Sequence, residues 1–303
     1  MTQRDKWINW GLFILLALIW GSSFILMKVG RTQLNGIQIG AIRIFSAGLV
    51  FAPFALFHFR QIPLRKLPLI FLSGVLGNLL PAFCFAAAID RIDSSLEGIL
   101  NSLTPLFVIV VGVLFFQLKL EARKIAGVLV GFVGLVLLSL YSGFNASNFG
   151  YAALVLLATL FYGINVNIVN RYLRGLPPLA MATVSLTMVA IPAGIVVAYQ
   201  NVFSMLRHDS GSLPAIGASA LLGIVGSAIA TALFYLLIKR AGALFASLVT
   251  YAIPVVAIAW GLLYGENISI AQFGCLAIIL GGVYLVNRKP PVPQRGHLGQ
   301  SDL

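Results

Sequence analysis

Residues 94–116 read SSLEGILNSLTPLFVIVVGVLFF, an apolar run with a proline near its middle. About 20 apolar residues in a helix are enough to cross the hydrocarbon core of a bilayer. Pro105 removes a backbone donor and clashes with the preceding turn, which costs about 3 kcal/mol in an ordinary helix interior. Such a break is tolerated in a membrane only where protein or a watery cavity satisfies the freed carbonyl. Asn101 and Thr104 can donate a hydrogen bond to that carbonyl or contact a ligand. We therefore interpret Pro105 as a helix kink at a binding site.

Apolar runs of similar length recur along the whole chain. Of its 303 residues, 60% are apolar and only 9% are charged, whereas about a quarter of the residues of a soluble domain are charged. The sequence therefore predicts an all-α polytopic membrane protein with ten transmembrane helices. The predicted spans are 8–28, 37–57, 67–89, 94–116, 123–141, 149–171, 178–200, 214–238, 243–264 and 269–287.

The basic residues predict the orientation of these spans. Fifteen of the 20 Lys and Arg residues fall on the side of the N-terminus, four fall on the other side, and Arg43 lies within a span. Because cytoplasmic loops are enriched in Lys and Arg, we expect a multi-pass protein of the plasma (inner) membrane with both termini in the cytoplasm. The net charge of +12 does not indicate nucleic acid, because the basic residues lie between the apolar runs and form no basic face.

The second half of the chain repeats the first. Sliding the sequence by 149 residues places Pro105 on Pro254 and Arg91 on Arg240, with several glycines on glycines. Five spans in each half turn the second half upside down, and the predicted positions of Arg91 outside and Arg240 inside agree with this inversion. Inverted repeats with Gly- and Pro-interrupted helices around a central cavity are typical of secondary transporters. The predicted units are a first five-helix repeat at 1–145, an inverted five-helix repeat at 146–288 and a disordered cytoplasmic tail at 289–303.

Several motifs resemble those of a known family. They are LIWGSSFILMK (18–28), AIRIFSAGLVF (41–51), SLTPLF (102–107) and the pair Gly127 and Gly134 in the fifth span. In this order, and in both repeats, they resemble the EamA family of the drug/metabolite transporter superfamily. The resemblance implies a 5+5 fold with ten helices around a central cavity and the export of small metabolites such as amino acids or drugs. It also implies an acidic residue after the fourth span of each half, where this chain has Gln117 in the first half and Glu266 in the second.

Polar side chains at midplane depth are the candidates for lining the cavity. Asn78 is the repeat equivalent of Ser227, and Asn101 is the equivalent of Thr250. An interhelical hydrogen bond, worth about 0.6 kcal/mol in a membrane, is the alternative role for each of them. Two symmetric pairs favour the cavity. The full set of predicted lining residues is Trp20, Ser22, Ser23, Asn78, Asn101, Thr104, Tyr162, Asn165, Ser227, Thr250 and Tyr251, and Pro105 and Pro254 are the predicted kinks.

Two charged residues fall within predicted spans. Arg43 lies in the second span and Glu97 in the fourth, at a similar distance from the outer face. A charge in a membrane helix costs at least about 2.5–3.5 kcal/mol, so it needs a partner or a path to water. Arg43 either reaches the outer surface or pairs with Glu97. Glu97 is correspondingly either a protonatable coupling group or a structural counter-ion for Arg43.

The sequence as a whole predicts a secondary active transporter, an exporter of small metabolites working by alternating access and driven by a proton or substrate gradient. A passive facilitator or channel is the first alternative, and a membrane-embedded lipid-processing enzyme is the second. The sequence shows no ATPase motif, metal-ligand spacing or nucleophile elbow, so no cofactor, metal or catalytic residue is expected. The expected partners are a small-molecule substrate, protons and the lipid bilayer, while the oligomeric state is left open.

Overall fold

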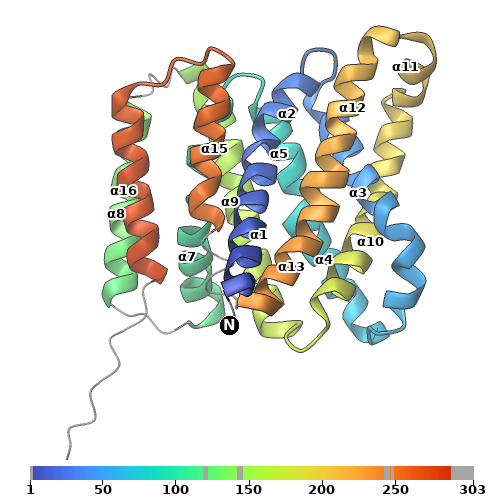
Figure 1. Ribbon diagram of the computed structural model, residues 1–303, viewed down its shortest axis with the longest axis horizontal. Coiled ribbons are helices and arrows are strands. Elements are labelled where there is room, and N and C mark those ends of the chain that lie inside the picture. Colours follow the sequence, from blue (N-terminus) through green and yellow to red (C-terminus); the bar gives the residue numbers. More distant parts are fainter. Residues whose placement is uncertain (1–2, 119–121, 142–145, 242–245, 247–248, 288–303) are drawn as a thin grey trace, which may run out of the picture.

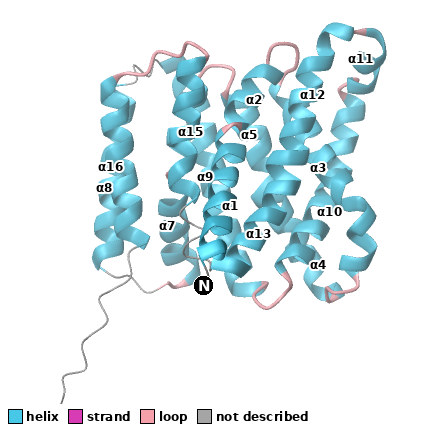
Figure 2. Cartoon of the chain, in the orientation of Figure 1, coloured by secondary structure: helices cyan, strands magenta, loops and turns pink. Residues whose placement is uncertain are grey.

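The computed structural model describes residues 3–118, 122–141, 146–241, 246 and 249–287. Within these residues the chain is helical, with no strand (Figure 2). The predicted all-α class is therefore confirmed. The predicted tail at 289–303 lies outside the described residues.

The helices of the first half follow the predicted spans closely. Their bounds are α1 Gln3–Gly21, α2 Ser23–Gly30, α3 Gly36–Phe59, η1 Leu64–Lys66, α4 Leu67–Gly74, η2 Val75–Leu79, α5 Leu80–Ala88, α6 Ser94–Asn101, α7 Thr104–Phe116 and α8 Ala122–Tyr141. Three predicted spans are thus divided, at Ser22, at Val75–Leu79 and at Ser102–Leu103.

The helices of the second half include the long α9 and one further divided span, at η4. Their bounds are α9 Ala146–Tyr172, α10 Pro178–Tyr199, α11 Val202–His208, η3 Ser210–Ser212, α12 Leu213–Leu221, η4 Leu222–Ile229, α13 Ala230–Ala241, α15 Val249–Leu263 and α16 Ile270–Asn287. Of the predicted ninth span, 243–264, residues 243–245 and 247–248 lie outside the described part of the chain.

Seven helical segments in the described residues are long and apolar enough to cross a membrane. They are Gln3–Gly30, Gly36–Phe59, Leu64–Ala88, Ser94–Phe116, Asn148–Tyr172, Pro178–Tyr199 and Ser210–Phe234. Three shorter apolar helices, Ile125–Leu138, Val249–Leu263 and Ile270–Leu285, fall within the remaining predicted spans. The chain is therefore a polytopic helical membrane protein, and the count of ten stays a prediction.

Helices that are distant in sequence pack side by side. Helix α3 packs against α10, and α8 packs against α16 at the opposite end of the molecule (Figure 1). Helix α9 contacts α5 and α7, while α1 contacts α13 and α15. Most of these contacts join the first half of the chain to the second, so the two halves are interleaved.

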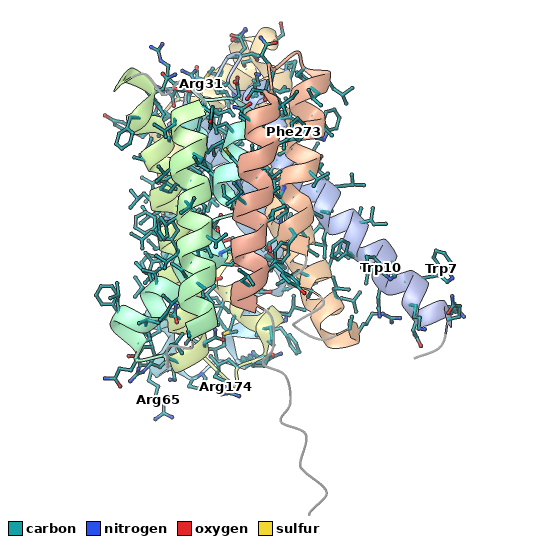
Figure 3. The ribbon with its side chains drawn as sticks, turned by 90° about the vertical axis from the view of Figure 1, so that its left-hand side faces the viewer. Trp7, Trp10, Arg31, Arg65, Arg174 and Phe273 are labelled. Atoms are coloured by element: carbon teal, nitrogen blue, oxygen red, sulfur yellow. The ribbon has the colours of Figure 1, made fainter. Side chains whose placement is uncertain are left out.

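Labelled arginines mark the two ends of the bundle. Arg65 and Arg174 lie at one end, the predicted cytoplasmic face, and Arg31 lies at the other, the predicted outer face (Figure 3). Near the predicted cytoplasmic end, α1 leans away from the bundle and exposes Trp7 and Trp10 (Figure 3). Tryptophan is enriched at membrane–water interfaces, so this position suits an interfacial anchor.

A close helix approach beside the cavity lies between η4 and α3. A Cβ atom added at Gly223 would overlap the carbonyl oxygen of Arg43 and the hydroxyl of Ser46. Only a residue without a side chain allows this approach.

We therefore predict that Gly223→Ala lowers the free energy of unfolding by about 1–3 kcal/mol, as overpacking does elsewhere. The measurement is the melting temperature of the purified protein in detergent. Gly217→Ala in the adjoining α12 is the matched control, because nothing lies within 4 Å of a Cβ built there. Equal melting temperatures for the two variants would contradict the close approach of η4 to α3.

Candidate functional site

A central cavity of about 280 Å³ lies among the helices. Helices from both halves of the chain line it. It contains eight of the eleven predicted lining residues: Trp20, Ser23, Asn78, Asn101, Thr104, Tyr162, Ser227 and Thr250. Arg43 lines it as well, together with apolar side chains that include Phe24, Met27, Phe85 and Ile253.

Two π-helical segments contribute residues to the wall of this cavity. Asn78 lies in η2 and Ser227 in η4, and the two segments occupy equivalent positions of the sequence repeat. A π-helical turn loosens the regular ladder of backbone bonds and is frequent at functional sites. One backbone carbonyl in η4, that of Gly226, accepts a hydrogen bond from the indole Nε1 of Trp20 at 3.0 Å. The cavity wall is therefore tied together between the first and second halves.

The predicted kink at Pro105 is a break between two helices. Helix α6 ends at Asn101, and α7 begins at Thr104 with Pro105 in its first turn. The carbonyl of Asn101 would accept a bond from residue 105 in a continuous helix, but proline has no N–H to give. The hydroxyl of Thr104 donates to that carbonyl instead, at 2.8 Å. Pro254, by contrast, lies inside the continuous helix α15.

A hydrogen bond from the guanidinium holds the Arg43 side chain at the edge of the cavity. Its Nε donates to the hydroxyl of Ser227 at 3.2 Å. The predicted ion pair with Glu97 is not formed, because neither carboxylate oxygen of Glu97 has a hydrogen-bond partner.

Glu97 is sealed inside the protein. Its exposed fraction is 0%, and it lies one helical turn before the cavity residue Asn101 on α6. Arg43, Glu266 and Tyr162 are the charged or titratable groups that act on it electrostatically. A carboxylate with no partner is costly in such surroundings, so this position suits a group that changes its protonation state.

Three predicted lining residues lie away from the central cavity. Ser22 accepts a hydrogen bond from Nε1 of Trp260 at 2.7 Å, which joins α1 and α2 to α15. Tyr251 lies in a shallow apolar hollow with Phe13 and Tyr284. Asn165 accepts a bond from Ser73 at 2.7 Å and lines a second cavity of about 240 Å³.

This second cavity adjoins the central one and extends toward the predicted cytoplasmic face. The two share Trp20, Gly77, Asn78 and Thr231 in their walls. Its other walls include Leu173, next to the predicted cytoplasmic end of α9. The two cavities together trace a route from the midplane toward that face.

A cluster at the opposite face was not predicted from the sequence. Glu266, in the loop between α15 and α16, binds Lys28, Ser94 and Ser95, and we call these four residues the Glu266 cluster. Its Oε1 accepts from Nζ of Lys28 at 2.8 Å and from the hydroxyl and backbone N–H of Ser94 at 2.6 and 3.0 Å. Its Oε2 accepts from the backbone N–H of Ser95 at 3.0 Å. The sequence showed only that an acidic residue, Glu266, follows the ninth span. Its partners lie more than 170 residues earlier in the chain, so the cluster could not be predicted.

The Glu266 cluster changes the acidity of two carboxyl groups. Burial alone would raise the pKa of Glu266, but the hydrogen bonds from Lys28, Ser94 and Ser95 outweigh it and lower the pKa to about 2. Burial raises the pKa of Asp93, and the nearby charge of Glu266 raises it further. Glu266 is therefore ionised at neutral pH and holds the second half of the chain on the N-terminus of α6, where exposed N–H groups favour an anion.

No group of three or more His, Cys, Asp or Glu residues in the described part of the chain is arranged to hold a metal ion. The chemistry of the site is that of a hydrogen-bonding cavity with one guanidinium and several aromatic rings.

The fold and the cavity define a polytopic helical membrane protein with a polar chamber between interleaved halves, the class to which solute transporters belong. A model of the EamA-like transporter family matches residues 8–140 and again residues 149–288. The chain therefore belongs to the EamA-like transporter family, and the resemblance drawn from its motifs is confirmed.

Several relatives are named as transporters. The chain is 26% identical over 282 residues to an uncharacterized transporter of Archaeoglobus fulgidus, covering 93% of this chain and 99% of that protein. It is 26% identical to the uncharacterized inner membrane transporter YedA of Escherichia coli, covering 94% and 92%. It is 24% identical to a probable amino-acid metabolite efflux pump of Salmonella typhimurium, covering 94% and 95%. One crystal structure matches with a TM-score of 0.57 at 18% identity, covering 94% of this chain and 98% of that one, which shows a shared fold.

We predict that Glu266→Gln lowers the free energy of unfolding by about 1.5–3 kcal/mol at pH 7, the range for hydrogen bonds to a charged group. Because the pKa of Glu266 is about 2 in the folded protein and 4.5 ordinarily, its stabilisation is present above pH 4.5 and is lost as the pH falls toward 2. Melting temperatures of wild type and variant should therefore converge over that interval.

The matched control is Asp90→Asn, which removes the more exposed ion pair of Asp90 with Arg31 at the same face. Exposed pairs are worth about 0–1 kcal/mol, so this variant should melt close to wild type. A gap between Glu266→Gln and wild type that stayed constant down to pH 2 would refute the assigned ionisation.

Proposed function

We propose that the protein is a secondary active transporter of the plasma (inner) membrane that exports small organic metabolites by alternating access of two inverted five-helix halves. The central cavity carries this proposal. It lies where the halves meet, and its wall contains polar side chains at sequence-equivalent positions, Asn78 with Ser227 and Asn101 with Thr250. Amino acids and related solutes are the expected cargo, in line with the named efflux pump among the relatives.

The pattern of helix contacts supports the inverted halves. If each predicted span is exchanged with its repeat equivalent, α3 takes the place of α10 and α8 takes the place of α16. The two helices of each pair are in contact. The same exchange turns the α5–α9 contact into α1–α13 and the α7–α9 contact into α1–α15, which also occur. The family model matches once in each half, which agrees with this division.

The distribution of contacts supports a conformation that is closed on the predicted outer face. There the Glu266 cluster joins the α15–α16 loop to α2 and α6, and Asp90 pairs with Arg31. Toward the other face the second cavity continues from the midplane. A transporter that takes up solute from the cytoplasm for export needs this arrangement in its loading state.

The test is transport by the full-length protein in proteoliposomes. A growth-rescue panel of toxic amino acids and analogues first selects the solute, because an exporter of the toxic compound confers resistance. Accumulation of that solute against its own gradient, driven by an imposed pH gradient, is the expected result. Downhill flux alone, insensitive to pH, would instead identify a passive facilitator.

We further propose that Glu97 carries the coupling proton. Its support is its complete burial, its two unpartnered oxygens and its position one turn from the cavity residue Asn101. In the conformation described here a neutral carboxyl is the form that fits these surroundings, since it carries no unpaired charge. In an exporter driven by proton influx, Glu97 would take up its proton when the outer face opens and release it toward the cytoplasm when solute loads.

We predict that Glu97→Gln abolishes accumulation driven by a pH gradient while solute counterflow, which needs no net proton movement, stays within about twofold of wild type. Counterflow is therefore the internal control for folding and substrate binding. Pumping with an unchanged pH dependence in Glu97→Gln would exclude Glu97 as the coupling site. Loss of counterflow as well would assign Glu97 a structural role.

A further inference from the structure

Arg43 is the charged group in the wall of the central cavity. Among the described residues that line the cavity, it alone carries a formal charge at neutral pH. Its backbone is fixed by the close approach of Gly223 in η4 to its carbonyl oxygen. The guanidinium therefore occupies a defined place on α3, beside the π-helical segment that carries Ser227.

Only one edge of this guanidinium is used. Its Nε donates to Ser227, and no described residue accepts a hydrogen bond from either terminal nitrogen. The Arg43 side chain is half-buried, and a partly desolvated cation with free donors favours the binding of an anion. The two terminal N–H groups form the fork that binds a carboxylate through two parallel hydrogen bonds.

Three hydroxyls of the cavity wall are less suited to binding an anion. Those of Ser23, Thr104 and Thr231 donate to carbonyls about one turn earlier in the same span, those of Ile19, Asn101 and Ser227. Each hydroxyl thus presents lone pairs to the cavity and keeps its proton in the helix. These oxygens would accept from an ammonium group but repel a second anionic group.

The apolar side of the cavity is aromatic. The ring of Phe85 lies 6.0 Å from that of Phe24 and 6.1 Å from that of Tyr162, between centroids, and all three line the cavity with Trp20. Stacking against such rings favours a flat apolar group. A volume of about 280 Å³ is at the small end of ligand pockets, which suits a compact solute.

From the transport function inferred above, we propose that the transported solute is a monocarboxylate with an aromatic or other compact apolar group, and that its carboxylate docks on the terminal nitrogens of Arg43. Amino acids bind as carboxylates, with the ammonium group facing the hydroxyl oxygens. Amines without a carboxylate are excluded by the charge of Arg43. A phosphate ester, with about −1.5 to −2 charges, would need more positive charge than this wall offers.

The test is equilibrium binding to the purified full-length protein by calorimetry, with four probes that share a phenyl ring and a short chain. They are 3-phenylpropionate, phenylalanine, 3-phenylpropanamide and 2-phenylethylamine. The two carboxylates should bind at least tenfold more tightly than the neutral amide and the amine, as expected for a charge-assisted pair. An amide or amine that binds within threefold of 3-phenylpropionate, or failure of both carboxylates to bind, would overturn the proposal.

Variants then locate the contact. Arg43→Gln should weaken 3-phenylpropionate binding at least tenfold and leave amide binding nearly unchanged, while Arg43→Lys should retain part of the preference. Arg91→Gln, the same change at an exposed arginine, is the matched control. Unchanged carboxylate binding in Arg43→Gln would overturn the proposal, and the wild-type probe series decides it if that variant does not fold.

Binding and transport can fail separately. Carboxylate-selective binding without flux in proteoliposomes would uphold the Arg43 site and refute the transport function. Flux of an amine or amide at the rate of the matched carboxylate would uphold transport and refute the site.

Discussion

The architecture depends on one constraint: every backbone carbonyl inside a membrane needs a hydrogen-bond donor. Continuous helices meet it internally, but the spans that form the cavity are broken. The carbonyl left free by Pro105 takes its donor from the Thr104 hydroxyl, and the Gly226 carbonyl in η4 takes the indole N–H of Trp20. Because these donors come from side chains at the midplane, the breaks gather polar groups in the centre of the protein. The cavity is thus a consequence of how the broken helices satisfy their backbones.

The two charges inside the membrane meet the cost of burial in different ways. Arg43 keeps its charge, gives one N–H to Ser227 and turns its remaining donors toward the cavity. Glu97 is fully enclosed with neither oxygen bonded, an arrangement that an uncharged carboxyl tolerates far better than an ionised one. Arg43 is therefore suited to meeting an anionic group and Glu97 to exchanging a proton. Since each acts on the other electrostatically, binding of a carboxylate at Arg43 would alter how firmly Glu97 holds its proton.

Composition and periodic breaks predicted the helical class, because hydrophobic length and proline act locally. Eight of the predicted lining residues lie in the wall of the central cavity. Hydrophobic length and proline position do not determine toward which neighbour a side chain points around its helix. Ser22, Asn165 and Tyr251 had suitable depth but face Trp260, a neighbouring cavity and an outer hollow. The Glu266 cluster was equally hidden, since its partners come from helices distant in sequence and meet only in the folded chain.

The sequence repeat makes Gln117 the equivalent of Glu266, and the two residues occupy similar turns. The backbone N–H of Gln117 bonds the carbonyl of Gly112, and that of Glu266 bonds the equivalent Gly261 at 2.8 Å. At the predicted outer face this turn presents a carboxylate to Lys28 and to the N-terminus of α6. At the predicted cytoplasmic face it presents a neutral amide, which brings no charge of its own to a contact. The outer turn therefore forms an ion pair that its inner equivalent cannot form. Under the proposed export function, this difference would favour a state that is closed at the outer face and loads from the cytoplasm.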